Sequence, residues 1–195
     1  MKIPKYSNNT GLPSSTSILS FGDDSCDRYY TDEGKARGTL VHYLCELYLE
    51  GHFIVETSID NDILPYFLSF KAWVDLMVDS VVLVEERLVD KNGLYCGQID
   101  FVAKLNGDSF NTLIDIKTST AKNGKTWPLQ LSSYRYLAED NGIPINRLGA
   151  LRVRRDGKLA FFDEVRNYKD NLKIFKNKLT NYYEENIEIG VVNNE

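Results

Sequence analysis

Two neighbouring runs of hydrophobic residues occupy the middle of the chain, at positions 95–105 and 109–118. Both are rich in β-branched, aromatic and aliphatic residues, and the segment Asn106-Gly107-Asp108 between them is a strong turn signal. This pattern predicts a β-hairpin. A shorter hydrophobic run from Ser80 to Leu88 predicts one more strand immediately before it.

Helical spacing of apolar residues flanks the predicted hairpin on both sides. Between Lys35 and Glu50 the apolar residues share one helical arc: Leu40, Val41, Leu44, Leu47 and Tyr48. His42 and Glu46, four residues apart, lie together on the opposite side of that helix. Trp127-Pro128 opens a second helix that runs to Asp140, with Gly142 just past its end.

The C-terminal third predicts a strand pair and a final amphipathic helix. The strand pair turns at Asp156-Gly157, and the helix places these apolar residues on one face: Leu172, Phe175, Leu179 and Tyr182. The predicted order is therefore helix, strand, hairpin, helix, strand pair, helix. This order indicates an α/β fold with a small mixed β-sheet flanked by helices.

Length and composition indicate one domain over residues 1–195 of the chain, with enough apolar residues for a core. We find no apolar run of eighteen residues and no charged-then-apolar N-terminal segment, so we expect a cytoplasmic protein without a membrane span. Cys26, Cys45 and Cys96 are widely spaced and contain no Cys-x-x-Cys pair, which argues against a disulfide framework or a zinc site.

The net charge is −5, whereas a protein that holds DNA mainly by neutralising phosphates is expected to be basic. Basic residues are nevertheless concentrated in two places. The first group surrounds the predicted strand pair: Arg147, Arg152, Arg154, Arg155 and Lys158. The second lies on the C-terminal helix: Lys169, Lys173, Lys176 and Lys178. For each group there are two interpretations, a solvated charged face and a DNA-binding track.

The hairpin brings together the residues with the clearest chemical meaning: Asp100, Asp115 and Lys117. A two-residue loop at 106–107 would place Asp115 diagonal to Asp100, and a loop at 107–108 would place the two directly opposite. In both registers all three charged groups share one face. Two carboxylates about 5 to 8 Å apart repel each other and favour a bound cation. Mg²⁺ or Mn²⁺ suits such oxygen ligands, although a surface hairpin with a charged face is the simpler alternative.

Four segments in this order resemble the PD-(D/E)XK nuclease superfamily, and specifically its RecB-like branch. They are Gly38-x-x-x-His42, the strand 97–102 with its Gly-x-Ile-Asp sequence, the strand 113–118 with Asp-x-Lys, and Gln130-x-x-x-Tyr134. Ile99 replaces the proline of the family's name, as in many RecB-like members. The N-terminal segment 12–19 is similar to a subgroup with phage-type exonucleases and the mitochondrial genome-maintenance exonuclease, and it is equally an ordinary helix N-cap.

The resemblance implies a role for each of these residues. His42, Asp100, Asp115 and the backbone carbonyl of Ile116 would bind Mg²⁺ or Mn²⁺, and the imidazole nitrogen favours Mn²⁺. Lys117 would orient water or stabilise charge on the phosphate. Glu85 or Glu86 would support the metal, with the spacing to the following leucine favouring Glu85. Gln130 and Tyr134 would contact the substrate.

By the same resemblance, we expect a metal-dependent DNA exonuclease that leaves 5′-phosphates and acts in recombination, repair or phage DNA metabolism. Its substrate would be single-stranded DNA or DNA with free ends, and a second copy of the chain or a recombination or replication protein is a candidate partner. An iron–sulfur cluster is not expected, because no cysteine follows Cys96. A structure-selective or restriction-like endonuclease and a non-catalytic DNA-binding protein are the alternatives.

Overall fold

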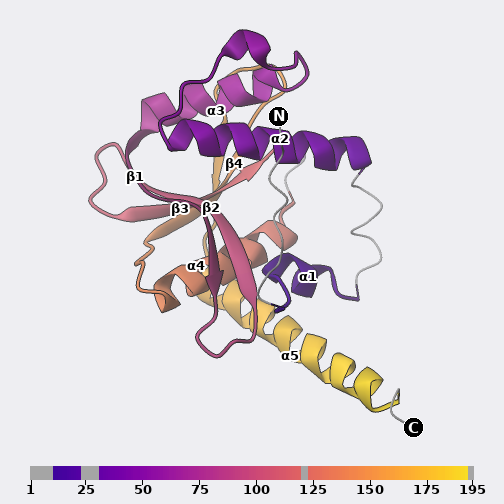
Figure 1. Ribbon diagram of the computed structural model, residues 1–195. Coiled ribbons are helices and arrows are strands. Elements are labelled where there is room, and N and C mark those ends of the chain that lie inside the picture. Colours follow the sequence, from indigo (N-terminus) through magenta and orange to yellow (C-terminus); the bar gives the residue numbers. More distant parts are fainter. Residues whose placement is uncertain (1–10, 23–30, 120–122, 193–195) are drawn as a thin grey trace.

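The computed structural model describes residues 11–22, 31–119 and 123–192, with side chains as far as Asn186. Five strands form one mixed sheet in the order β1-β2-β3-β4-β5 (Figure 1). Their bounds are β1 Val78–Val89, β2 Cys96–Leu105, β3 Asn111–Lys117, β4 Arg147–Arg152 and β5 Phe161–Glu164. The α/β fold predicted from the sequence, a small mixed sheet flanked by helices, is confirmed.

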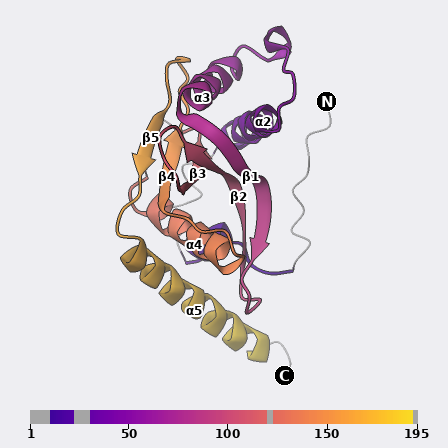
Figure 2. The same ribbon diagram turned by 90° about the vertical axis from the view of Figure 1, so that its left-hand side faces the viewer.

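Helices cover both faces of this sheet (Figure 2). One face packs against α2 (Asp32–Leu49) and α3 (Leu64–Met77), and the other packs against α1 (Ser15–Ser20), α4 (Thr126–Asp140) and α5 (Tyr168–Val192). A short 3₁₀ turn, Glu56–Ser58, lies between α2 and α3. Each face has its own hydrophobic core, which we call the α2–α3 core and the α4–α5 core.

Strand pairing explains why the sheet is mixed. The pairs β1–β2, β2–β3 and β4–β5 are antiparallel, whereas β3 and β4 are parallel. A parallel pair needs a long crossover connection, and α4 provides it between Lys117 and Arg147. The predicted hairpin and the predicted strand pair are both present. The hairpin loop spans residues 106–110, so it is longer than the two-residue loops considered from the sequence.

Local sequence signals account for several helix ends. Ser14 caps α1 by accepting a hydrogen bond from the Ser17 backbone N–H, as an N-cap serine does. Thr31 caps α2 in the same way through Gly34. Pro65 lies in the first turn of α3, where its missing N–H costs no hydrogen bond.

Helix α3 is absent from the order of elements predicted from the sequence. Its buried residues fall at helical spacing: Tyr66, Phe67, Ser69, Phe70, Trp73 and Val74. That spacing, together with the proline at its start, is the signal that identifies it. Its aromatic side chains belong to the α2–α3 core, where they pack with buried residues of α2.

Cys45 and Cys96 are buried and form no disulfide within the described part of the chain, and Cys26 lies outside that part. None of the helices searched among the described residues is long and apolar enough to cross a membrane.

Candidate functional site

Asp100 lies at the point in strand β2 where the regular alternation of side chains between the two faces of the sheet is interrupted. Ile99 belongs to the α4–α5 core, yet Phe101, two residues later, belongs to the α2–α3 core. Regular alternation would put both on the same face, so it reverses at Asp100. The β2–β3 ladder ends next to it, at the pair Phe101 and Ile114. Beyond this pair the Asp100 carboxylate itself accepts the backbone N–H of Ile116, with Oδ2 2.5 Å from the nitrogen.

Glu85 marks a matching irregularity on the neighbouring strand β1. It lies between two ladder pairs, Val84 with Phe101 and Glu86 with Ile99, and its φ is +45°. Positive φ is uncommon outside glycine, costs free energy and is concentrated at functional sites. Glu85 lies beside Asp100, whereas the neighbouring Glu86 is exposed. The structure therefore brings Glu85, and not Glu86, into the candidate site.

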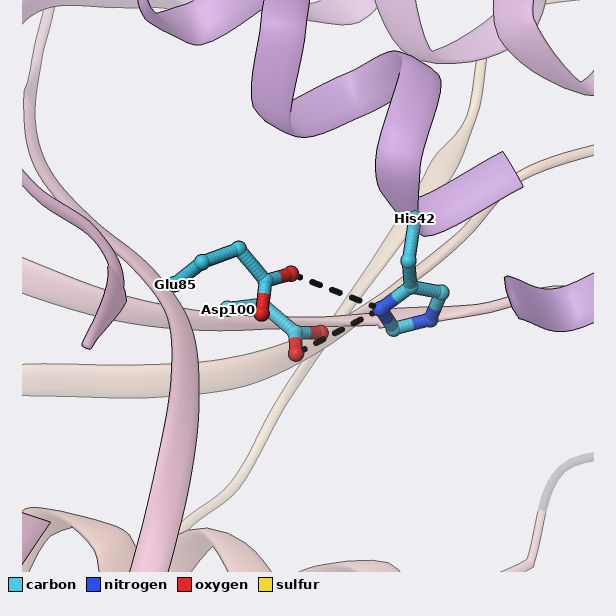
Figure 3. Close-up of side chains that lie close together, drawn as sticks. All are labelled: His42, Glu85 and Asp100. Atoms are coloured by element: carbon cyan, nitrogen blue, oxygen red, sulfur yellow. Dashed lines mark ion pairs between the residues drawn. The ribbon is translucent and has the colours of Figure 1, made fainter. Parts of the chain in front are cut away.

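His42 approaches these two carboxylates from helix α2 (Figure 3). Its Nδ1 lies 3.5 Å from Asp100 Oδ1 and 3.8 Å from Glu85 Oε1. One ligand atom from each of the three side chains lies within 4.8 Å of the others, and we call this group the His–Glu–Asp cluster. Burial disfavours a charged imidazole, but the carboxylates of Asp100 and Glu85 outweigh it and raise the pKa of His42 to about 10.

Helix α2 packs on more of its circumference than the apolar arc predicted from the sequence. His42 points to the sheet beside the buried residues Val41 and Cys45. Tyr48, from the predicted apolar arc, instead packs edge-on against Phe67 and Phe70 of α3. Helix α2 therefore has two packed sides, one toward the sheet and one toward α3. His42 lies on the sheet side of the helix, 3.5 Å from Asp100, the residue with which the resemblance grouped it.

A second group of predicted residues lies next to the His–Glu–Asp cluster. Lys117 Nζ is 2.6 Å from Asp115 Oδ2 and donates a hydrogen bond of 2.9 Å to Gln130 Oε1. The Gln130 amide nitrogen in turn donates to the Tyr134 hydroxyl at 3.0 Å and to Thr16 Oγ1 at 3.3 Å. Gln130 therefore links the lysine of β3 to helix α1, and Tyr134 is buried behind it.

Electrostatic coupling connects the two groups. Burial raises the pKa of Asp115 to about 6, with Lys117 opposing the rise and Asp100 adding to it. Burial also acts to raise the pKa of Asp100, but the charges of His42 and Lys117 and the Ile116 N–H bond outweigh it and lower the pKa. The two aspartates therefore differ: Asp100 is held as a carboxylate, whereas Asp115 titrates closer to neutrality.

Gln98 and Arg87 hold Glu85 from behind, and the sequence analysis did not single out either residue. Gln98 Nε2 donates to Glu85 Oε2 at 2.6 Å, and Arg87 Nη2 donates to Gln98 Oε1 at 3.0 Å. Gln98 and Arg87 are direct cross-strand partners on β2 and β1. The available sequence signal was the two-residue spacing between Gln98 and Asp100, which places such side chains near each other along a strand.

The donor set of the His–Glu–Asp cluster suits a divalent metal ion. One imidazole nitrogen and two carboxylates converge, and this combination fits Mn²⁺ or a similar transition ion better than Ca²⁺. Asp115 lies outside this 4.8 Å group, although it is close enough for Asp100 to shift its pKa. The Ile116 side chain is buried in the α2–α3 core, so only its backbone faces Asp100.

The predicted basic stretch is largely ion-paired in the structure. Arg147 pairs with Asp108 at 2.6 Å, and the guanidinium groups of Arg152 and Arg154 pair with carboxylates on or near β5. Because these side chains already have carboxylate partners, DNA binding by the basic stretch stays a prediction.

Comparison with known proteins identifies no relative: neither a protein-family model nor a curated protein matches this chain.

Proposed function

We propose that this chain is a divalent-metal-dependent nuclease of the PD-(D/E)XK type, RecB-like branch, that degrades DNA from its ends and leaves 5′-phosphates. One observation carries the proposal. The other three motifs, distant in the sequence, surround Asp100: His42 is 3.5 Å from it, the Ile116 N–H binds it, and Gln130 holds the neighbouring Lys117. A surface hairpin with incidental charges gives no reason for a half-buried histidine and a glutamate to converge on a buried aspartate.

The His–Glu–Asp cluster supplies the first metal ligands in this proposal, with the Asp115 carboxylate and the Ile116 carbonyl as further oxygen donors. A bound divalent ion polarises the scissile phosphate and lowers the pKa of an attacking water. The chain's own contribution is to hold the ligands in place before metal binds. Gln98 fixes one oxygen of Glu85, and the Ile116 N–H fixes one oxygen of Asp100, which leaves the other oxygens directed toward His42.

Lys117 supplies positive charge beside the ligands. Its ammonium group is held between Asp115 and Gln130 and also lies 5.8 Å from the centre of the Trp127 ring. A charge held in this way stabilises negative charge that develops on a phosphoryl oxygen, and it needs little reorganisation during the reaction. Gln130 is thus a positioning residue for Lys117 in this proposal, in addition to its expected contact with the substrate.

The decisive experiment is DNA cleavage with end-labelled linear single- and double-stranded DNA beside closed circles. Each substrate is incubated with Mg²⁺, Mn²⁺ or EDTA, and wild type is compared with Lys117→Ala. A Lys91→Ala variant provides a matched control, because 68% of the Lys91 side chain is exposed and Lys91 belongs to neither of the two basic groups. We expect loss of linear substrate with metal, 5′-phosphate products, and no activity in Lys117→Ala.

Two results would replace the proposal. Nicked or linearised circles would indicate an endonuclease. Absence of cleavage in every condition, with Mn²⁺ binding demonstrated separately, would favour a protein that uses this fold to bind DNA or a partner.

A further inference from the structure

An exposed aromatic ring lies at the edge strand of the sheet between two arginines. Phe161 opens β5 and keeps 48% of its surface exposed. The guanidinium carbons of Arg152 and Arg154 lie 5.2 and 4.6 Å from the centre of its ring. We call these three residues the Phe161 platform. Asp163 pairs with Arg152 at 2.5 Å, and Asp156 accepts two hydrogen bonds from Arg154, so both guanidinium groups are held in fixed positions.

Strand register places this platform beside Lys117. Lys117 of β3 pairs with Arg152 of β4, and Arg152 pairs with Phe161 of β5. Neighbouring strands are about 4.8 Å apart, so the backbones of Lys117 and Phe161 are separated by about 10 Å. The adjacent residues on these strands belong to or pack against the α2–α3 core: Ile116, Leu151 and Phe162. Because side chains alternate along a strand, Lys117, Arg152 and Phe161 share the opposite face.

The chemistry of the platform favours unpaired bases over duplex phosphates. Both guanidinium groups already have carboxylate partners, so they are poorly suited to act as free phosphate clamps. Aromatic rings and guanidinium planes instead stack on nucleobases, and this contact requires that the bases are not paired in a duplex. Exposed Arg155, on the turn beside the platform, adds positive charge for the backbone of the same strand, whereas Lys158 lies 3.8 Å from Asp156.

We propose that the Phe161 platform stacks a base of single-stranded DNA and so guides an unpaired strand to Lys117. This inference rests on the proposed nuclease function and narrows its substrate from DNA with free ends to an unpaired strand held at Phe161. The platform selects for single-stranded ends because the stacked base is next to the site at which the backbone would be cut.

Binding of fluorescein-labelled oligothymidylate to the full chain, measured by anisotropy with Ca²⁺ as the divalent ion, tests this inference. Phe161→Ala should weaken binding by about 5- to 150-fold, which corresponds to the usual contribution of one base–aromatic stack. Phe161→Tyr retains a ring and should bind within about twofold of wild type. Leu159→Ala is the matched control, because Leu159 is a nearby side chain with 45% exposure and no ring, and it should also stay within about twofold.

Oligonucleotides with one abasic position at successive sites identify the stacked base. At one position the missing base should weaken wild-type binding by the same factor as Phe161→Ala, and it should have no effect on that variant. Equal binding by all variants, or equal sensitivity of wild type and Phe161→Ala at every abasic position, would overturn the inference. If wild type cleaves DNA but Phe161→Ala binds normally, only the platform is refuted. If wild type neither binds nor cleaves DNA, both proposals fail.

Discussion

Gly97 sets how closely helix α4 can approach the sheet, and its replacement by alanine gives a sharp test of this packing. A Cβ at position 97 would lie 2.8 Å from Leu137 Cδ1 and 2.8 Å from Tyr134 Cε1. Carbon atoms pack best at about 3.5 to 4.0 Å, so each contact is too short by about 0.7 Å or more. Leu137 and Tyr134 are both buried in the α4–α5 core, so other core side chains surround them. We therefore expect helix α4 to move away from β2.

This movement has a cost in stability and a further cost at the site. Overpacking of a well-packed core costs about 1 to 3 kcal/mol, so the free energy of unfolding of Gly97→Ala should fall by about that amount. Helix α4 also carries Gln130, which holds Lys117 at 2.9 Å. Because a misplacement of about 1 Å can reduce catalysis about 100-fold, the proposed nuclease activity should fall by more than the stability loss explains.

Urea unfolding followed by tryptophan fluorescence measures the stability, and DNA cleavage at a temperature where both proteins are folded measures the activity. Gly124→Ala is the matched control, because its Cβ would meet no atom within 4 Å and its φ is not in the left-handed region. We expect this control to match wild type in both assays. If Gly97→Ala unfolds at the wild-type urea concentration, the close contact between β2 and α4 is not as described.

Three further predictions concern the site itself. Gln98→Met removes the hydrogen bond that holds Glu85, so Mn²⁺ affinity measured by isothermal titration calorimetry should fall about 10- to 100-fold, and unchanged affinity would contradict the positioning role. Since the pKa of His42 is about 10 without metal and a ligand imidazole must be neutral, Mn²⁺ binding at pH 7.5 should release about one proton and tighten as pH rises. Calorimetry in buffers of different ionisation enthalpy detects this proton, and identical heats in all buffers would refute it. Gln130→Leu should lower kcat and leave Mn²⁺ affinity unchanged, because Gln130 contacts Lys117 and not the His–Glu–Asp cluster. A parallel loss of Mn²⁺ affinity would show that the Lys117–Gln130 pair and the His–Glu–Asp cluster do not act separately.

Most strands and helices can be predicted from the spacing of hydrophobic residues, but the length of the hairpin loop cannot. The turn residues Asn106-Gly107-Asp108 identify the position of the hairpin without giving the length of its loop. Two registers were considered for the hairpin. The observed pairs, such as Phe101 with Ile114, follow the register that places Asp100 opposite Asp115. The five-residue loop itself was not among the predictions.

The packing of α2 could not be predicted in full because α3 was missing from the predicted elements. Tyr48, from the predicted apolar arc, packs against Phe67 and Phe70 of α3. The side of α2 that carries His42 and the buried Cys45, a residue outside that arc, faces the sheet. The spacing of apolar residues therefore identified an arc of the helix without identifying its packing partner.

Glu85 could be chosen over Glu86 only with the structure. Glutamate has no special preference for positive φ, so nothing in the residue type indicates the +45° conformation or the direction of its side chain. The surrounding β1–β2 ladder imposes this conformation, and a ladder is a property of two strands together.

The reversal of alternation at Asp100 also governs which changes of chain length the protein can accept. An added or deleted residue between Gly97 and Phe101 would exchange the faces of Ile99 and Asp100, and so would bury a carboxylate among apolar side chains and expose an isoleucine at the ligand position. The loop at 106–110 has no such constraint, because it lies beyond the last ladder pair, Lys104 with Asn111. In related chains, insertions and deletions should therefore accumulate in this loop, while the count of residues around Asp100 stays constant even where their identities change.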